Sequence, residues 1–228
     1  MLPAVPVSII IPVLDEAREI GQFLPHWREL HQAGAELIVV DGGSADATVA
    51  LIEREGFAVQ TAPRGRARQM NAGAAKASAA LLIFLHADTR LPATGLDLVR
   101  EALGGRHCWG RFDVELGGGP DRCLRLVARL MNLRSRLTGI ATGDQAIFIS
   151  RACFEAVGGF PDQPLMEDIA LSAQLRRRTA PVCLRAKVIT SSRRWRRHGT
   201  CRTIVTMWLL RLAYALGVPS TRLARFYR

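Results

Sequence analysis

Acidic residues follow three strongly apolar segments of this chain. Asp15 and Glu16 come after residues 8–14, Asp41 comes after residues 37–40, and Asp88 comes soon after residues 81–85. Continuous apolar runs of this kind predict strands that are buried on both faces of a parallel sheet. Since ligands in open α/β sheets sit beyond the carboxyl ends of the strands, we expect one shared site for a cation or a polar substrate. A lone Asp would more simply cap a turn, but three similar strand ends favour the shared site.

Two loops near these strands have residue types that suit a nucleotide. Gly42 and Gly43 let the backbone turn sharply after Asp41, which could accept a hydrogen bond from a base or a ribose. Arg66 and Arg68 stand where an arginine-rich segment opens a predicted helix, whose N-terminus adds partial positive charge. Together these features suit a diphosphate, whereas a charge run alone would indicate only a solvated basic face.

Length and composition favour one basic globular domain. The chain has 228 residues, 49% of them hydrophobic, and a net charge of +11 from 31 Lys and Arg against 20 Asp and Glu. Such a charge suits polyanions: nucleic acid, phosphorylated substrates or an anionic membrane. The five cysteines include no C-x-x-C pair, so we expect reduced thiols in a cytosolic compartment. Pro3 and Pro6 lead straight into the first strand without a basic segment followed by an apolar one, so we expect no secretion signal.

Strands and helices alternate regularly through the first half, which predicts an α/β fold: a doubly wound, mostly parallel central sheet flanked by helices. Pro25 predicts a kink or two short helices between residues 16 and 32, and Ser44 could cap the next helix. Residues 108–116 alternate apolar and polar types, which indicates a half-exposed strand. Strands are predicted at 6–13, 36–40, 57–61, 80–85, 108–116, 145–150 and 182–189, with helices at 46–55, 67–77, 94–103, 121–137 and 167–178.

Four motifs occur in a fixed order: residues 12–16 (PVLDE), 41–48 (DGGSADAT), 65–73 (GRARQMNAG) and 86–88 (HAD). Together they resemble family-2 glycosyltransferases of GT-A fold over roughly the first 90 residues. The resemblance implies a single GT-A-like domain over 1–228. Its parts would be a nucleotide-sugar-binding half (1–104), an acceptor-side half (105–199) and a basic, apolar C-terminal helical region (200–228).

The resemblance also implies a reaction: transfer of a sugar from a nucleotide-diphospho-sugar donor to an acceptor hydroxyl or a lipid phosphate, with inversion and metal assistance. The family's metal motif is usually Asp-x-Asp, and here its first position is His86. Asp88 would therefore bind Mn²⁺ or Mg²⁺, while His86 contacts the donor or lies behind the ligands; Mn²⁺ tolerates imidazole better. The donor-side residues implied are Pro12, Val13, Asp15, Glu16, Asp41, Gly43, Arg66, Arg68, His86, Ala87 and Asp88.

The second half carries the acceptor-side candidates. Glu167 and Asp168 resemble the family's acidic pair, with Asp168 as the base that accepts the acceptor's proton; alternatively, both acids simply favour a helix N-terminus. Gly143, Asp144 and Gln145 precede a strand and would bind sugar hydroxyls or shape the turn. Arg194 and Trp195 are faintly similar to the Arg-Trp element of processive members, although the Gln that normally precedes it is missing.

Two apolar segments raise the question of a membrane. In the helix at 121–137, Leu126, Leu130, Leu133 and Leu137 form a stripe beside arginines. The helix suits an anionic bilayer or a lipid-phosphate acceptor, but the stripe could equally pack on the sheet and leave only the arginines solvated. Residues 203–218 are fewer than the ~20 that span a bilayer, and Arg211 interrupts them, which predicts a core-packed or interfacial helix. We expect a cytoplasmic protein, with peripheral attachment to the cytoplasmic face of a membrane left open.

Two other functions compete with sugar transfer. A nucleotidyltransferase normally has a glycine-rich, basic pyrophosphate loop after its first strand, which residues 12–16 do not provide. A nucleic-acid-binding protein would fit the charge, but two Tyr and eight Phe offer few stacking platforms, and acidic strand ends oppose a phosphate backbone. The expected partners are therefore a nucleotide-sugar donor and an unidentified acceptor, a lipid-linked one included.

Overall fold

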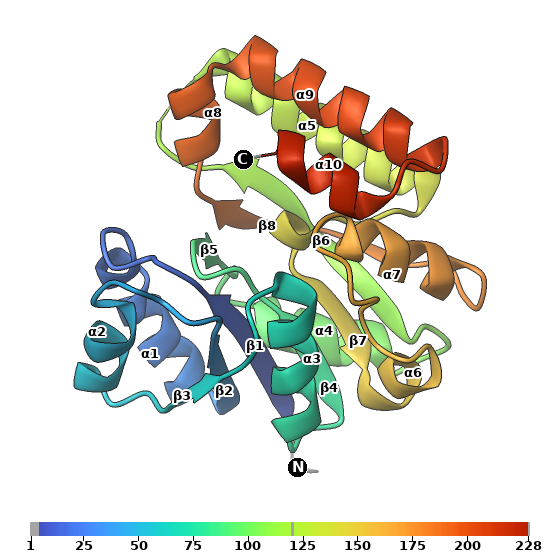
Figure 1. Ribbon diagram of the computed structural model, residues 1–228. Coiled ribbons are helices and arrows are strands. Elements are labelled where there is room, and N and C mark those ends of the chain that lie inside the picture. Colours follow the sequence, from blue (N-terminus) through green and yellow to red (C-terminus); the bar gives the residue numbers. More distant parts are fainter. Residues whose placement is uncertain (1–4, 120, 228) are drawn as a thin grey trace.

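A computed structural model describes residues 5–119 and 121–227 (Figure 1). Pro3, which precedes the first predicted strand, lies outside these ranges. Within them the strands form an eight-stranded sheet in the order β3-β2-β1-β4-β7-β6-β8-β5. The strands are β1 (Val7–Val13), β2 (Ala35–Asp41), β3 (Val59–Thr61), β4 (Leu81–Phe84), β5 (Thr89–Arg90), β6 (Trp109–Leu116), β7 (Ile147–Ser150) and β8 (Val182–Thr190).

The first four strands in this order are parallel, and the second half of the sheet mixes directions. β1 pairs in parallel with β2 and β4, whereas β7 runs antiparallel to both β4 and β6. Val13 pairs with Asp41, and Asp41 pairs with Thr61. The loops after β1 and β2 therefore leave the sheet at the same edge, as the sequence predicts for a shared site.

Helices cover both faces of the sheet because side chains alternate along each strand. Ile9 and Ile11 join the core under α1, α2 and α4, while Ile10 joins the core under α3, α6 and α7. Gly73 brings α3 close to the sheet, since a Cβ there would lie 2.5 Å from Cγ2 of Ile10. The helices are α1 (Leu24–Gln32), α2 (Thr48–Arg54), α3 (Arg66–Lys76), α4 (Gly95–Leu103), α5 (Arg122–Thr138), α6 (Arg151–Ala156), α7 (Glu167–Arg176), α8 (Arg193–His198), α9 (Thr200–Ala215) and α10 (Ser220–Phe226), with 3₁₀ turns η1 (Ile20–Gln22) and η2 (Gly143–Gln145).

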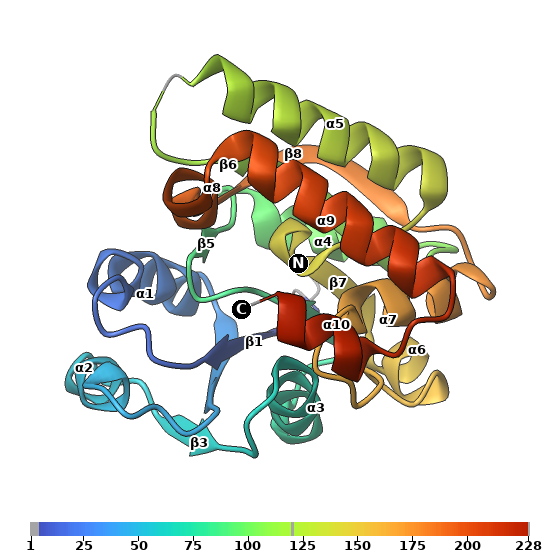
Figure 2. The ribbon, with the colours of Figure 1, turned by 45° about the horizontal axis from the view of Figure 1, so that its top comes forward.

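Helices α5, α8, α9 and α10 gather at one end of the molecule. Figures 1 and 2 show α5 and α9 side by side there, with α10 under α9 in Figure 1, and β1 begins at the opposite end. α5 packs on β6 through Leu124, Val127 and Ala128, and α9 contributes Ile204 to the same cluster. None of the helices in the described ranges is both long and apolar enough to cross a bilayer.

The α/β prediction is confirmed, and the predicted strands and longer helices lie close to their expected bounds. The segment with Pro25 divides into η1 and α1, with Pro25 in the first turn of α1, where its missing N–H breaks no helical hydrogen bond. β5, α6, α8 and α10 were not expected. All four are short, so their periodicity is too brief to read.

Two local predictions are wrong. Ser44 does not cap a helix: α2 begins at Thr48, whose N–H donates to Asp46 (3.0 Å). β6 is not half-exposed, because it is an inner strand and both Trp109 and Arg111 are fully buried. Asp113 forms an ion pair with Arg111 and so offsets the cost of burying its charge.

The exposure of the leucine stripe of α5 decides between the two alternatives for this helix, packing on the sheet or facing solvent. Leu126, Leu130, Leu133 and Leu137 are 52–78% exposed, so the stripe does not pack on the sheet. The opposite side of the helix is buried instead, through Leu124, Val127, Ala128, Asn132 and Ser135.

Candidate active site

A cavity of about 450 Å³ lies where the strand ends, α3, α7 and the α5–α10 end of the molecule meet. Segments far apart in the chain contribute to its wall, including the loop after β1, the loop after β4 and η2. Of the predicted site residues, those that line it are Pro12, Glu16, Arg66, His86, Ala87, Asp88, Gly143, Asp144, Glu167, Asp168, Arg194 and Trp195. Val13, Asp15, Asp41, Gly43, Arg68 and Gln145 do not line it.

The loop after β2 is closed by its own hydrogen bonds. The buried carboxylate of Asp41 accepts from the N–H groups of Gly43 (2.8 Å) and Ser44 (3.0 Å) and from the Ser44 hydroxyl (2.5 Å). Gly43 has φ +90°, a conformation that favours glycine. Exposed Asp15 accepts from Ala45 N–H (2.8 Å), which ties the loop after β1 to the loop after β2. Asp15 and Asp41 thus stabilise the loops after β1 and β2, which form a rim beside the cavity.

Two residues of α3 have structural partners. Gln69, which is buried, donates to the carbonyls of Val13 (2.8 Å) and Val40 (2.9 Å) and so fixes the helix start over two strand ends. Arg68 points to Asp162, with Nε 2.8 Å from Oδ1, and both side chains are more than half exposed. Its charge therefore sits outside the cavity.

Asp88 faces arginines inside the cavity. Burial raises the pKa of Asp88, and the nearby charges of Arg193 and Arg66 act against that rise. Glu16 forms an ion pair with Arg193 (3.1 Å), and burial raises the pKa of Glu16 as well. Two carboxylates and two arginines from separate segments thus form one charged cluster, in which the arginines could bind a phosphate.

His86 is held as a neutral ring. Burial, followed by the charge of Arg66, lowers the pKa of His86 well below its usual value. Its Nε2 is buried without a hydrogen-bond partner in the described residues. Gly143 packs directly against this nitrogen, since a Cβ at that position would overlap it. The ring therefore packs between the end of β4 and η2, with Nε2 unpartnered in the described part of the chain.

Asp168 and Glu167 open α7 at the cavity wall. Asp168 accepts from Gly143 N–H (2.8 Å) and from its neighbour Ile169 (2.7 Å). Burial raises the pKa of Asp168, although these hydrogen bonds and the charges of Arg66 and Arg134 oppose the rise. Burial and the adjacent Asp168 raise the pKa of Glu167, which lies 3.8 Å from Arg66. A carboxylate with a raised pKa in a cavity is suited to accepting a proton near neutral pH.

Asp144 and Arg134 add unpartnered polar atoms to the same wall. Oδ1 of Asp144 and the Nε and Nη2 atoms of Arg134 are buried without hydrogen-bond partners in the described residues. Burial raises the pKa of Asp144 and lowers the pKa of Arg134. Buried polar groups usually have hydrogen-bond partners, so these atoms mark a place where a polar ligand would supply the missing hydrogen bonds.

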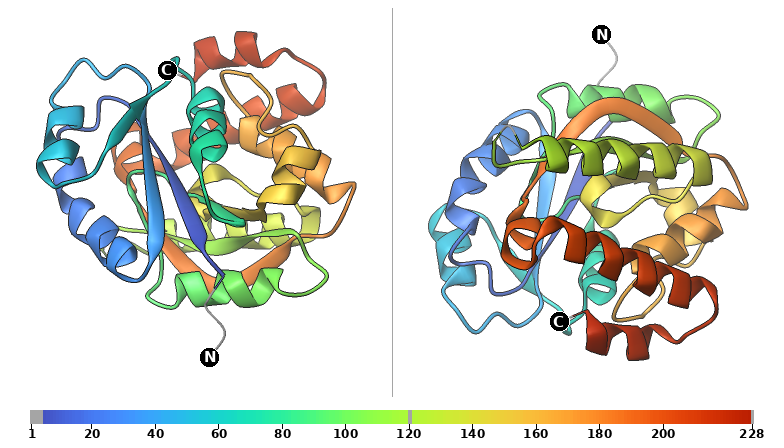
Figure 3. Two further views of the ribbon diagram at one scale, coloured as in Figure 1. Left: turned by 90° about the horizontal axis from the view of Figure 1, so that it is seen from below. Right: turned by 90° about the horizontal axis from the view of Figure 1, so that it is seen from above.

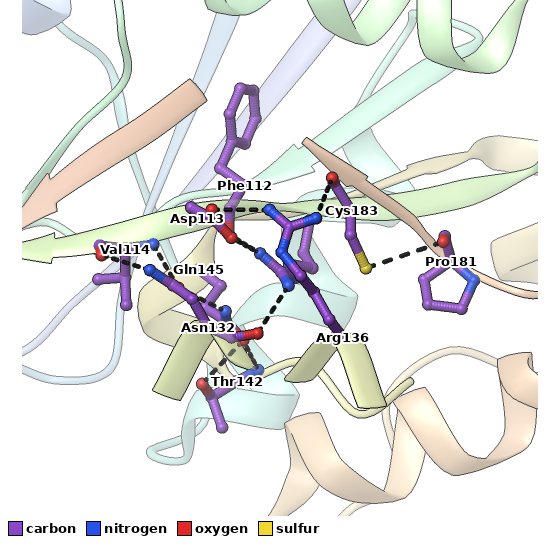
Figure 4. Close-up of polar contacts among 10 residues, drawn as sticks. Phe112, Asp113, Val114, Asn132, Arg136, Thr142, Gln145, Pro181 and Cys183 are labelled. Carbon is purple, nitrogen blue, oxygen red and sulfur yellow. Dashed lines mark hydrogen bonds and ion pairs between the residues drawn. The ribbon is translucent and has the colours of Figure 1, made fainter. Parts of the chain in front are cut away.

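A buried polar network fixes η2 beneath this wall (Figure 4). Asn132 of α5 exchanges hydrogen bonds with the backbone of Val114 (2.8 and 2.9 Å) and accepts from Gln145 Nε2 (3.3 Å). Gln145 in turn accepts from Thr142 N–H (3.2 Å). Arg136 donates to Asp113 (2.7 Å) and holds α5 to β6. Fully buried Gln145 therefore shapes the turn, and Asp144 is the residue of this segment with a free oxygen in the cavity.

The C-terminal helices supply the remaining wall. The Arg194 guanidinium stacks 3.7 Å from the Tyr227 ring centre and donates to the Tyr227 carbonyl (3.0 Å). Trp195 lines the cavity as well. Sequence reasoning missed Arg134, Arg193 and Tyr227. Only Arg193 had a visible signal, as the residue before the Arg194-Trp195 pair.

Comparison with known proteins places this site in context. The family model Glycosyl transferase family 2 matches residues 8–148. Uncharacterized glycosyltransferases from two strains of Mycobacterium tuberculosis are each 36% identical over 160 residues, covering 65% of this chain and 58% of the relative. The chain thus spans little more than half the length of the curated relatives it matches.

Solved structures share the fold at low identity. S. aureus TarS 1–349 in complex with UDP-GlcNAc has a TM-score of 0.61 at 15% identity, covering 82% of this chain and 58% of that one. The mannosyltransferase PcManGT of Pyrobaculum calidifontis in complex with GDP-Man and Mn²⁺ has a TM-score of 0.62 at 20% identity. The match covers 82% of this chain and 57% of that one. The M. tuberculosis glucosyl-3-phosphoglycerate synthase in complex with Mg²⁺ and UDP has a TM-score of 0.58 at 19% identity. The match covers 82% of this chain and 70% of that one.

These neighbours have the GT-A fold, as the sequence motifs predict for this chain. The family match covers the strands that carry Asp15, Asp41 and Asp88, and it extends through η2. On this basis the chain belongs to glycosyl transferase family 2.

Proposed function

We propose that the chain transfers a sugar from a nucleoside-diphosphate donor to a hydroxyl or lipid-phosphate acceptor, with inversion of the anomeric centre. The observation that carries this proposal is the convergence of Asp88, Arg66, His86, Asp144 and Asp168 on one cavity. Family membership favours sugar transfer over nucleotidyl transfer and over nucleic-acid binding.

Asp168 is the proposed catalytic base. Two backbone N–H groups hold its carboxylate in the cavity. Its raised pKa makes the carboxylate a stronger base toward the proton of the acceptor. Glu167 beside it keeps Arg66 oriented. Attack by the deprotonated acceptor on the face of the sugar opposite the leaving diphosphate would invert the anomeric carbon.

The donor half, residues 1–104, would bind the nucleotide and its diphosphate. Arg66 faces the cavity together with Arg193 of the acceptor half, and Arg66 begins α3, so the partial positive charge of the helix N-terminus adds to theirs. Asp15, Asp41, Gly43 and Val13 would form the nucleoside rim, with Pro12, Glu16 and Ala87 as its inner wall. Arg68 would act at the outer edge, through its pair with Asp162.

A divalent cation would be held by Asp88, with His86 beside it. Among the described residues no cluster of three His, Cys, Asp or Glu side chains forms a complete site. Asp88 and His86 nevertheless both line the cavity, where they fit a cation whose other ligands come from a diphosphate, and imidazole suits Mn²⁺ better than Mg²⁺. When bound, the ion would offset the negative charge that develops on the leaving diphosphate.

The acceptor half, residues 105–199, would place the incoming hydroxyl or phosphate. Asp144 offers a free oxygen, Gly143 positions Asp168 through its N–H, and Gln145 holds the turn that carries both. Arg194 and Trp195 would close the far wall. The proposal includes a cytoplasmic location, where the reducing environment would keep the five cysteines as thiols.

A donor screen tests the proposal. Thermal shifts are measured with a panel of nucleotide-sugars, with and without Mn²⁺, and the donor found is used in transfer assays. We expect Asp88→Asn to abolish metal-dependent transfer and His86→Asp to keep or improve it. Transfer that is indifferent to Asp88→Asn would refute the metal assignment, and the absence of any nucleotide-sugar shift would refute the proposed function.

A further inference from the structure

Large apolar side chains stand exposed on two neighbouring helices. On α5 they recur every three or four residues, and on α9 they do the same, so each helix presents one stripe. Nine residues form what we call the α5–α9 face: Leu126, Leu130, Leu133, Leu137, Val205, Trp208, Leu209, Leu212 and Leu216, all 52–78% exposed. Soluble monomers rarely expose many large apolar side chains close together, so the gathering of these nine on two neighbouring helices suits this face to binding a partner.

The cavity opens within this face. Val127, Leu130 and Met131 of α5 and Ile204, Met207 and Trp208 of α9 all line it. Leu130 and Trp208 are 54% and 74% exposed, which puts them at its rim. Figure 2 and the right panel of Figure 3 show the two helices side by side on one side of the molecule. The cavity wall is thus apolar near this opening and charged at the strand ends.

Arginines without acidic partners flank the stripes. On α5, Arg122 and Arg129 stand one helical turn before Leu126 and Leu133, and all three of Arg122, Arg125 and Arg129 are exposed. Arg202, Arg222 and Arg225 are exposed on α9 and α10. In the described part of the chain none of these six forms an ion pair. Residues 122–138 and 193–226 contain no Asp or Glu.

We propose that the α5–α9 face docks on an anionic lipid bilayer, with its leucines and Trp208 in the interface and the flanking arginines on lipid headgroups. An interfacial apolar face with basic flanks has the chemistry that such a surface binds. A second copy of the chain fits less well, because a two-fold contact through this face would bring unpaired arginines together. Nucleic acid would match the arginines but not the leucines. The proposal goes beyond sugar transfer and does not depend on it.

Vesicle sedimentation tests the docking without donor or acceptor. The full chain is centrifuged with phosphatidylcholine vesicles, with or without phosphatidylglycerol. We expect it to sediment with the anionic vesicles and to be released by high salt, since the attraction between arginines and headgroups is screened. Trp208 is expected to shift its fluorescence to shorter wavelength on binding, because its exposed ring enters a less polar environment.

Matched variants locate the contact. Leu209→Glu combined with Leu212→Glu is expected to abolish sedimentation, whereas Val5→Glu, at the opposite end of the molecule, is expected to have no effect. Arg125→Gln should weaken binding roughly fivefold, and Arg54→Gln on α2 should not. Circular dichroism checks that each variant folds. The replaced side chains are exposed, so the fold should survive.

Three outcomes would overturn the proposal. The first is equal binding of the Leu209→Glu, Leu212→Glu double variant and the parent chain. The second is a parent chain that does not sediment with anionic vesicles. The third is a dimer in light scattering that the double variant dissociates while vesicles fail to bind, which would assign the face to a second copy. None of these results would bear on nucleotide-sugar binding, so the two proposals can fail separately.

Discussion

The loop after β2 and the turn before β7 both hold carboxylates near the cavity, but they satisfy them in opposite ways. In the first loop, Asp41 accepts hydrogen bonds from Gly43 and from Ser44, and Asp15 accepts one from Ala45. In the second, Oδ1 of Asp144 is buried without a partner in the described residues. Nε2 of the nearby His86 is also buried and unpartnered among these residues. The first region is complete by itself, whereas the second leaves hydrogen-bonding capacity open.

This difference separates stability from ligand binding. A carboxylate that accepts several N–H donors stabilises its loop, while a buried carboxyl without partners costs free energy until a ligand supplies them. Replacing residues in the first region should therefore weaken the fold, and replacing them in the second should mainly affect the ligand. One prediction below tests the proposed base Asp168, and three test this contrast.

The largest effect is expected for Asp168→Asn. Loss of the proposed base should lower the transfer rate by roughly 10³-fold, because general-base catalysis contributes about 10²–10⁴-fold. Donor binding, followed by thermal shift, should survive. Asp97→Asn is the matched control, since Asp97 is 81% exposed on α4 and pairs with Arg100, and neither residue lines the cavity. Turnover near that of the parent enzyme would remove Asp168 from this role.

Exchanging the two loop carboxylates for amides should separate the two regions directly. Asp41→Asn places an NH₂ group against N–H donors and should destabilise the fold by about 2–3 kcal/mol. The melting temperature should fall by roughly 5–10 °C for a chain of this size. Asp144→Asn should leave stability unchanged or raise it, because it removes a buried charge with an unpartnered oxygen. Equal losses in both variants would show that the contrast is wrong.

Gly143→Ala should show how tightly the second region is packed. The added methyl overlaps Nε2 of His86, and overpacking of this kind costs about 1–3 kcal/mol. In a His86→Ala background the same change should cost almost nothing, because the obstructing ring is gone. Urea unfolding of the four chains measures this coupling. Additive losses would mean that the turn moves away from the ring.

The smallest effect concerns pH. Because burial raises the pKa of Asp144, its folded form binds a proton more readily than the unfolded chain does. The stability advantage of Asp144→Asn over the parent should therefore be largest at neutral pH and shrink as pH falls through that raised pKa. Melting curves of both chains over a pH series provide the check. An advantage that grows on acidification would contradict the assigned direction.

Much of the fold followed from the sequence because long apolar runs and helical periodicity are local signals. The strands that end near Asp15, Asp41 and Asp88 were predicted this way, and the structure brings Asp88 together with Glu16 and Asp168 in one cavity. Arg134 and Tyr227 were not found, because each joins the cavity only through the packing of α5 and the C-terminal helices. The burial of Arg111 was missed because its cover comes from tertiary contacts, although its ion-pair partner Asp113 lies only two residues away on the same strand.

The pair between Glu16 and Arg193 joins residues 177 positions apart, and Arg194 rests on Tyr227 still later in the chain. During synthesis, the strand ends that carry Glu16 and Asp88 leave the ribosome well before this wall exists. A nascent chain therefore carries only half of its pocket until α8, α9 and α10 have been translated and have folded back over it. Premature termination between Thr190, where β8 ends, and Arg193 would release a protein with its strands in place and its pocket open to water.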